Sequence, residues 1–158
     1  MKIYFASPLF TEMEFTFNQV LVNKIRRDYP TLDIFLPQEQ GEINDKNAYA
    51  DSKMIAMLDT QAVLESDLMI AVLDGQVIDP GVASEIGIAY QAGIPIIGLY
   101  TDSRQLGADN QKKIDALQTV AESQFAYVNL YTVGLIKLNG IIVSSSDHLL
   151  QVLPDYLK

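Results

Sequence analysis

Residues 68–87 read LMIAVLDGQVIDPGVASEIG, an uninterrupted apolar run followed by a turn and the start of a helix. Apolar runs without alternation are typical of a central strand in a parallel sheet. Asp79 as N-cap and Pro80 as the first helical residue follow ordinary helix-start chemistry. Glu85 then lies on a helix face whose other members are small or apolar, where a carboxylate must be satisfied, paired or used. We interpret Glu85 as a functional residue.

Composition limits the classes of protein to which this chain can belong. The 158 residues, of which 49% are hydrophobic, predict one domain of ordinary size over residues 1–158. The absence of cysteine excludes disulfides and thiolate metal sites and fits a reducing compartment. The apolar segment at the N-terminus is too short for a signal peptide or a membrane helix, so we expect a cytoplasmic protein. A net charge of −9 argues against nucleic acid as a partner.

Strand-like and helix-like segments alternate along the whole chain. We expect strands at 2–6, 32–36, 68–73, 95–100 and 141–144, and helices at 12–28, 51–65, 81–92, 111–123 and 146–153, the last one capped by Ser146. Residues 129–138 fit either a strand or a helix. Alternation with short connections predicts a doubly wound α/β fold, in which helices cover both faces of a parallel five-stranded sheet.

Ligands of such folds bind beyond the carboxyl ends of the strands. The segments that reach this edge are 7–12, 37–50, 74–85 and 101–110, and we expect the polar loop 38–50 to cover the site. Ser7, Gly81 and Ser84 belong to these segments and are candidates for substrate contact. The loops before Glu85 therefore converge on one crevice with Glu85 and Asp79.

Charge is distributed unevenly around this crevice. No lysine or arginine occurs between Lys53 and Arg104, whereas the same stretch contains seven acids: Asp59, Glu65, Asp67, Asp74, Asp79, Glu85 and Asp102. Acids without a basic partner nearby suggest a pocket that binds hydroxyls or a metal, although Glu65 and Asp67 fit a solvated face. Asp59 is a poor residue for a helix interior and borders the apolar stripe formed by Ile55, Leu58 and Ala62.

Several common catalytic motifs are absent. No G-x-G-x-x-G follows the first strand, and neither a P-loop nor a G-x-S-x-G elbow occurs. His148 is the single histidine, which excludes a histidine-based triad or zinc site. Carboxylate chemistry remains, centred on Glu85 with Asp79 and Asp59. A carboxylate nucleophile suits glycosyl transfer, in which it attacks an anomeric carbon and forms a covalent glycosyl-enzyme.

Four motifs in order resemble the nucleoside 2-deoxyribosyltransferases. They are IYFA at 3–6, the pair Asp59 and Asp67 eight residues apart, DLMIAV at 67–72 and DPGVASEIG at 79–87. The resemblance extends from about residue 3 to residue 100 and resumes at 129–130. It implies a flavodoxin-like fold, an enzyme that moves 2-deoxyribose from one nucleobase to another, and a role in purine salvage.

The resemblance also implies roles for individual residues. Glu85 resembles the nucleophile that attacks C1′, and Tyr4 the tyrosine whose hydroxyl positions that glutamate. Asp59 and Asp79 resemble the two aspartates that bind the nucleoside and assist proton transfer, without a division of these tasks. Gln38, with Gln40 as a rival, resembles a glutamine that contacts the base. Asn129 resembles an asparagine that reaches the 5′ end of the sugar from a neighbouring subunit.

The resemblance implies deoxynucleosides and free nucleobases as substrates, a homo-oligomer, no cofactor and no metal ion. The nearest alternative is a hydrolase that cleaves the N-glycosidic bond of deoxynucleoside 5′-monophosphates, with Ser7 and Ser84 as hydroxyls for the phosphate. A sensor that binds nucleotides without turnover is a second alternative. A third reading assigns Asp74, Asp79 and Glu85 to Mg²⁺.

Overall fold

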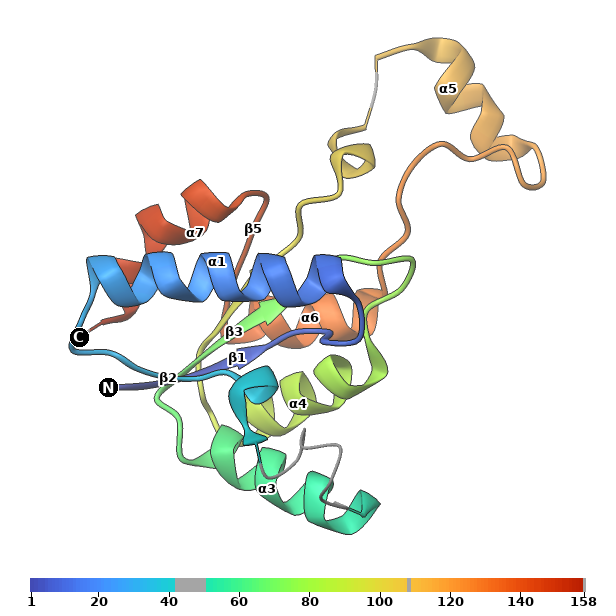
Figure 1. Cartoon of the computed structure of the whole chain (residues 1–158). Coiled ribbons are helices and arrows are strands. Elements are labelled where there is room, and N and C mark those ends of the chain that lie inside the picture. The colour runs from blue at the N-terminus through green and yellow to red at the C-terminus, as the bar shows by residue number, and fades with distance from the viewer. Residues whose placement is uncertain (42–50, 108, 158) are drawn as a thin grey trace.

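The computed structural model describes residues 1–41, 51–107 and 109–157, and shows the predicted α/β architecture (Figure 1). Five parallel strands form one sheet in the order β2-β1-β3-β4-β5. The strands are β1 (Lys2–Ala6), β2 (Asp33–Phe35), β3 (Leu68–Val72), β4 (Ile96–Leu99) and β5 (Gly140–Val143). All five residues of β3 are buried. The prediction of a central strand at this position is confirmed, because helices cover both faces of the sheet here.

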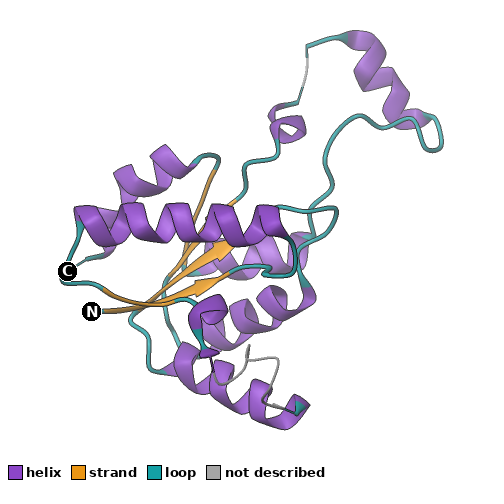
Figure 2. Cartoon of the chain, viewed as in Figure 1, coloured by secondary structure: helices purple, strands orange, loops and turns teal. Residues whose placement is uncertain are grey.

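Helices lie on both sides of the sheet (Figure 2). The α-helices are α1 (Glu12–Asp28), α3 (Ser52–Leu64), α4 (Pro80–Gln91), α5 (Gln111–Asp115), α6 (Leu130–Leu138) and α7 (Ser146–Val152). Short 3₁₀ turns are η1 (Pro37–Glu39), η2 (Ser103–Leu106), η3 (Ala116–Gln118) and η4 (Leu153–Tyr156). No helix in the described ranges is both long enough and apolar enough to cross a membrane.

Each face of the sheet has its own apolar core. Helices α1 and α7 pack on one face, and α3, α4 and α6 pack on the other. Because side chains alternate along a strand, Ile3 and Phe5 of β1 join the first core, whereas Tyr4 and Ala6 join the second. This alternation places the Tyr4 side chain on the same side of the sheet as α3 and α4.

Helix starts agree closely with the capping chemistry in the sequence. Helix α1 begins with a capping box, in which Thr11 and Glu14 bond reciprocally to each other's backbone N–H groups. Helix α4 begins as predicted, since the Asp79 carboxylate accepts a hydrogen bond from Val82 N at 3.0 Å and Pro80 is the first helical residue. The segment that fitted either a strand or a helix forms α6, capped by Asn129.

Three expectations about the chain outside the core need correction. The predicted helix 111–123 ends at Asp115 and continues only as η3, because this segment stands away from the sheet and its apolar residues Ile114, Leu117 and Val120 are exposed (Figure 1). The cap of α7 is Ser145 and not Ser146, since the Ser145 hydroxyl accepts a hydrogen bond from His148 N. The loop expected at 38–50 begins with η1, and its remaining part at 42–50 lies outside the described residues.

Candidate active site

The loops that follow β1, β2 and β3 surround a cavity of about 340 Å³ together with α3 and α4. This volume lies at the lower end of the range for small-molecule sites. The residues that line it are Ser7, Leu9, Phe10, Pro37, Ile55, Asp59, Asp79, Gly81, Val82 and Glu85. The cavity therefore lies at the carboxyl edge of the sheet, where the topology predicts ligand binding.

Glu85 is mostly buried and points its carboxylate at Tyr4. The Tyr4 hydroxyl donates a hydrogen bond of 2.7 Å to Glu85 Oε1, across 81 residues of sequence. The Tyr4 ring is fully buried and stacks on Phe35, with the two ring centroids 5.4 Å apart. Packing thus holds the tyrosine in place, and the hydrogen bond that the resemblance implies is present.

The surroundings of Glu85 change its acidity in two directions. Burial raises the pKa of Glu85 to about 7, and the negative charges of Asp59 and Asp79 act in the same direction. The hydrogen bond from Tyr4 lowers the pKa, because it stabilises the ionised carboxylate. Burial, with the adjacent Glu85 charge, raises the pKa of Tyr4 far above its ordinary value, so its hydroxyl stays protonated and remains a donor.

Asp59 provides a second carboxylate that is open to a ligand. Burial raises the pKa of Asp59, and its Oδ1 is buried without a hydrogen-bond partner in the described part of the chain. Ile55, one turn earlier on α3, also lines the cavity and is 38% exposed. The stripe predicted from Ile55, Leu58 and Ala62 is therefore wrong for Ile55, because Ile55 lines the cavity and does not belong to the apolar core.

Three further polar or small residues also line the cavity. Asp79 lines the cavity while its Oδ1 caps α4, and an added side-chain carbon at Gly81 would lie 3.0 Å from that oxygen. Ser7 is only 6% exposed, and its hydroxyl has no hydrogen-bond partner among the described residues. A buried hydroxyl without a partner beside a cavity is available to a bound ligand.

Several predicted site residues lie away from the cavity. Ser84 is exposed and donates its hydroxyl hydrogen to Pro80 O, at the first turn of its own helix. Gln38 does not line the cavity, because its amide bonds to Asn18 and to α1. Asn129 caps α6, where its Oδ1 accepts hydrogen bonds from the next turn of backbone. The rival Gln40 donates to Leu36 O.

Four of the seven acids between Lys53 and Arg104 have other partners. Glu65 forms an ion pair with Lys2, whose backbone N–H donates to Asp67, and Asp102 pairs with Arg104. Both carboxylate oxygens of Asp74 accept hydrogen bonds of 2.6 Å from Thr101, which leaves the Mg²⁺ reading without its third ligand. The acids that line the cavity are Asp59, Asp79 and Glu85.

The apolar residues of the cavity rim were not singled out individually from the sequence, although most of them lie in segments that were expected to reach this edge. Leu9, Phe10, Pro37 and Val82 line the cavity together with Ile55, and Phe10 is 75% exposed. Their positions directly after strands or inside a helix start were the only indication that they reach this edge. A ligand with a flat apolar part and several polar atoms fits a cavity that combines these apolar side chains with three carboxylates.

Solved structures with similar folds come from several bacteria. A conserved protein from Enterococcus faecalis V583 is 60% identical, with 99% of both chains covered and a TM-score of 0.93. A 2-deoxyribosyltransferase from Bacillus psychrosaccharolyticus is 18% identical, with 94% of this chain and 90% of that chain covered and a TM-score of 0.61. A CMP N-glycosidase from Clostridium botulinum is 22% identical, with 99% of this chain and 100% of that chain covered and a TM-score of 0.53. At 18% and 22% identity, the similarity to the last two structures shows only that the fold is shared.

The family model described as nucleoside 2-deoxyribosyltransferase matches residues 3–147. No protein with curated annotation matches the chain. The match covers nearly all of the sequence, including the described strands from Ile3 onward and the residues that line the cavity. Members of this family are enzymes that act on the glycosidic bond of nucleosides, with nucleosides and nucleobases as substrates. The chain belongs to the nucleoside 2-deoxyribosyltransferase family.

Proposed function

We propose that this protein transfers 2-deoxyribose between nucleobases through a covalent intermediate on Glu85. The observation that carries the proposal is the pairing of Glu85 with the buried Tyr4 hydroxyl inside a cavity that also contains Asp59 and Asp79. A nucleophilic carboxylate must be ionised and oriented at the same time. The Tyr4 hydrogen bond serves both needs, because it binds one oxygen and favours the charged form.

In the first half-reaction, Glu85 Oε2 attacks C1′ while Oε1 keeps its hydrogen bond from Tyr4. The C1′–N bond breaks, its electron pair goes to the base nitrogen, and the departing base takes a proton from Asp59. Asp59 suits the role of acid because burial favours its protonated form. In the second half-reaction an incoming base attacks C1′, returns a proton to Asp59 and displaces the Glu85 carboxylate.

The remaining parts of the cavity match the two ends of a nucleoside. The apolar rim formed by Leu9, Phe10, Pro37, Ile55 and Val82 suits the faces of a nucleobase. Asp79 and the unpartnered Ser7 hydroxyl suit the hydroxyl groups of the sugar. We infer purine deoxynucleosides as substrates in a salvage reaction in the cytoplasm.

Hydrolysis of deoxynucleoside 5′-monophosphates is the second candidate, and the Ser7 hydroxyl favours it as a donor to a phosphate. One structural neighbour, the Clostridium botulinum protein, is described as a CMP N-glycosidase. Against this candidate, none of the ten described residues that line the cavity is a lysine or arginine. A doubly charged phosphate would meet three acids there without a countercharge.

The test is base exchange with deoxyinosine and free adenine, followed by chromatography. We expect deoxyadenosine and hypoxanthine from the wild type, and a loss of at least about 1,000-fold in Glu85→Gln, which removes the nucleophile. Glu65→Gln is the matched control, since Glu65 is an exposed carboxylate bound to Lys2, and its activity should equal that of the wild type. Deoxyribose released from deoxyinosine without an acceptor, or deoxyribose 5-phosphate released from deoxyinosine 5′-monophosphate in a parallel incubation, would select the hydrolase. No turnover, or full activity in Glu85→Gln, would refute the proposal.

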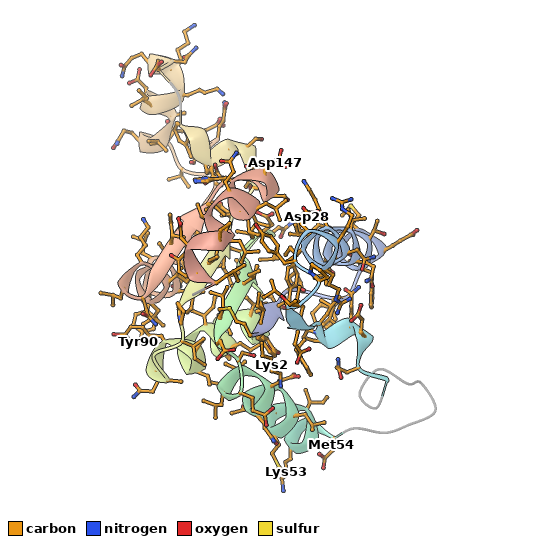
Figure 3. The ribbon with its side chains drawn as sticks, turned by 90° about the vertical axis from the view of Figure 1, so that its left-hand side faces the viewer. Lys2, Asp28, Lys53, Met54, Tyr90 and Asp147 are labelled. Carbon is orange, nitrogen blue, oxygen red and sulfur yellow. The ribbon has the colours of Figure 1, made fainter. Side chains whose placement is uncertain are left out.

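We also propose that two copies of the chain assemble and that Asn129 acts in the site of the neighbouring subunit. The layer formed by α3, α4 and α6 is apolar on its outside, with Met57, Leu64 and Leu138 more than half exposed. Outside the cavity, the charged residues of these three helices are Lys53 and Lys137, whereas α1 alone has six. Figure 3 shows Lys53 at the outer end of α3. Charge depletion of this kind is typical of the core of an interface.

Mixing two inactive variants tests this arrangement. Glu85→Gln and Asn129→Ala should each lack activity as pure oligomers, because one loses the nucleophile and the other the contact from the neighbour. Hybrid oligomers contain some sites with both residues intact and should regain activity after subunit exchange. Absence of recovery in hybrids confirmed by native mass spectrometry would contradict the shared site.

A further inference from the structure

Helix α1 carries a polar residue at the N-terminal end of its buried face. Leu21, Val22 and Ile25 are its other buried residues, and Asn18 precedes them at matching helical spacing with only 1% of its surface exposed. Asparagine disfavours a helix interior, and a buried amide destabilises the protein unless it is hydrogen-bonded. A leucine has nearly the same shape and would suit an apolar core better. The hydrogen bonds that the Asn18 side chain forms therefore explain why an asparagine occupies this buried position.

The Asn18 amide connects three separate segments. Its Nδ2 donates one hydrogen bond of 2.9 Å to Pro8 O, in the loop after β1, and another of 3.0 Å to Gln38 Oε1, in η1. Gln38 Nε2 donates back to Phe15 O of α1 at 3.2 Å. We name this set of contacts the Asn18–Gln38 link. It joins the first loop and η1 to the rigid body of α1.

We infer that the Asn18–Gln38 link positions two residues of the apolar rim, Leu9 and Pro37, and so determines how tightly the nucleobase is held. We call these two residues the apolar walls of the cavity. Pro8 directly precedes Leu9, and Gln38 directly follows Pro37, and both Leu9 and Pro37 line the cavity. Asn18 and Gln38 do not line it themselves, so they act as positioning residues. The inference rests on the proposed function, because it places the base between these walls. It also replaces the expected contact of Gln38 with the base by an indirect role.

The physical reason is that the residues bonded in the link are the direct chain neighbours of the two wall residues, Leu9 and Pro37. A hydrogen bond to the residue next to a wall residue restricts the backbone of that wall to one arrangement. Loss of the bond allows the loop after β1 to move relative to η1, and the gap between the walls then varies. A base bound in a variable gap loses contact area, whereas Glu85 and Tyr4 are held by α4 and β1 and keep their geometry.

The test compares Asn18→Leu with the wild type in base exchange. Asn18→Leu keeps the shape of the side chain and removes both donors. We expect KM for deoxyinosine to rise about tenfold, equivalent to about 1.4 kcal/mol of binding, with kcat within about threefold. Asn23→Leu on the same helix is the control, since Asn23 is exposed and its side chain accepts a hydrogen bond from Gln19. The control should keep the wild-type KM.

Gln38→Met removes the contacts of the link that involve Gln38, keeps the bond from Asn18 to Pro8 O, and should also raise KM. Because both residues belong to one link, the double variant should differ little from Asn18→Leu. Additive effects in the double variant, an unchanged KM in folded Asn18→Leu, or a loss confined to kcat would overturn the inference. Circular dichroism establishes that each variant is folded.

A hydrogen-exchange measurement separates this inference from the proposed function. If the wild type exchanges no bases, the proposed function fails while the link remains testable. Asn18→Leu should then show faster amide exchange in peptides that cover 7–11 and 36–41 than the wild type and Asn23→Leu. Equal exchange rates in all three proteins would overturn the link itself.

Discussion

Replacement of Tyr4 by phenylalanine tests the acidity of Glu85 most directly. The substitution keeps the buried ring that stacks on Phe35 and removes only the hydroxyl that donates to Glu85. Because this hydrogen bond lowers the pKa of Glu85, its loss should raise that pKa further above about 7. The opposing influences, burial and the two aspartate charges, remain unchanged in the variant.

The size of the effect follows from the bond that is lost. A hydrogen bond to a charged group contributes about 1.5–3 kcal/mol, which corresponds to about 1–2 pKa units. The pKa of Glu85 in Tyr4→Phe should therefore lie at about 8–9. At pH 7 the ionised fraction would fall from about one half to roughly 1–10%, and kcat/KM should fall roughly 5- to 50-fold.

The assay is kcat/KM for base exchange between pH 5 and pH 10. In the wild type we expect activity to rise with pH around 7, because the nucleophile must lose its proton. In Tyr4→Phe the rise should move to higher pH, so the ratio of wild-type to variant activity should shrink as pH rises, whereas loss of the Asp59 proton lowers the activity of both proteins alike. A rise at the same pH in both proteins, or a shift to lower pH, would refute the reasoning. A carbon-13 NMR titration of labelled glutamate measures the same pKa without turnover.

Three further predictions concern stability. Because burial raises the pKa of Glu85 from 4.5 to about 7, the folded protein binds this proton more tightly than the unfolded chain, so the protein loses stability as pH rises from 4.5 to 7. Glu85→Gln should thus stabilise the protein by up to about 3 kcal/mol at pH 8 and scarcely at pH 4, as measured by urea unfolding. An equal gain in stability at the two pH values would contradict this. Gly140→Ala should prevent folding, because the new carbon would collide with the Ile96 backbone. Gly134→Ala is the control, since its new carbon meets open space and should leave thermal stability unchanged or raise it by about 0.5–1 kcal/mol. Soluble Gly140→Ala with a wild-type melting curve would be inconsistent with the β4–β5 contact. Leu21→Ala should cost about 2–5 kcal/mol in chemical unfolding, since Leu21 is 3% exposed in the core under α1, and a loss below 1 kcal/mol would show that this core repacks.

Much of the fold could be predicted because its determinants are local. The buried run at 68–73 has no polar residue, so it reads as a strand covered on both faces. Thr11 with Glu14, and Asp79 with Pro80, define helix starts within four residues of chain. The helix predicted at 111–123 failed for the opposite reason, since its residues pack on nothing and local preference alone did not extend it past Asp115.

The candidate site was predictable only in part. Glu85, Asp79 and Asp59 could be singled out because each is an acid in an unusual local context. Gln38 was chosen by resemblance, and its amide is instead used between α1 and η1. Ser84 was expected near the ligand, yet one helical position separates a side chain that faces the cavity from one that faces outward.

The amino-acid sequence alone determined the order and type of most elements and the edge of the sheet where acids gather, because apolar periodicity and capping act over a few residues. Tertiary structure decided which of those acids share a cavity and which have partners elsewhere. The contact between Tyr4 and Glu85 spans 81 residues, and it depends on the side of β1 that faces α4. The apolar rim and the Asn18–Gln38 link likewise join segments that only packing of helices on the sheet brings together, since hydrogen bonds and burial act through space rather than along the chain.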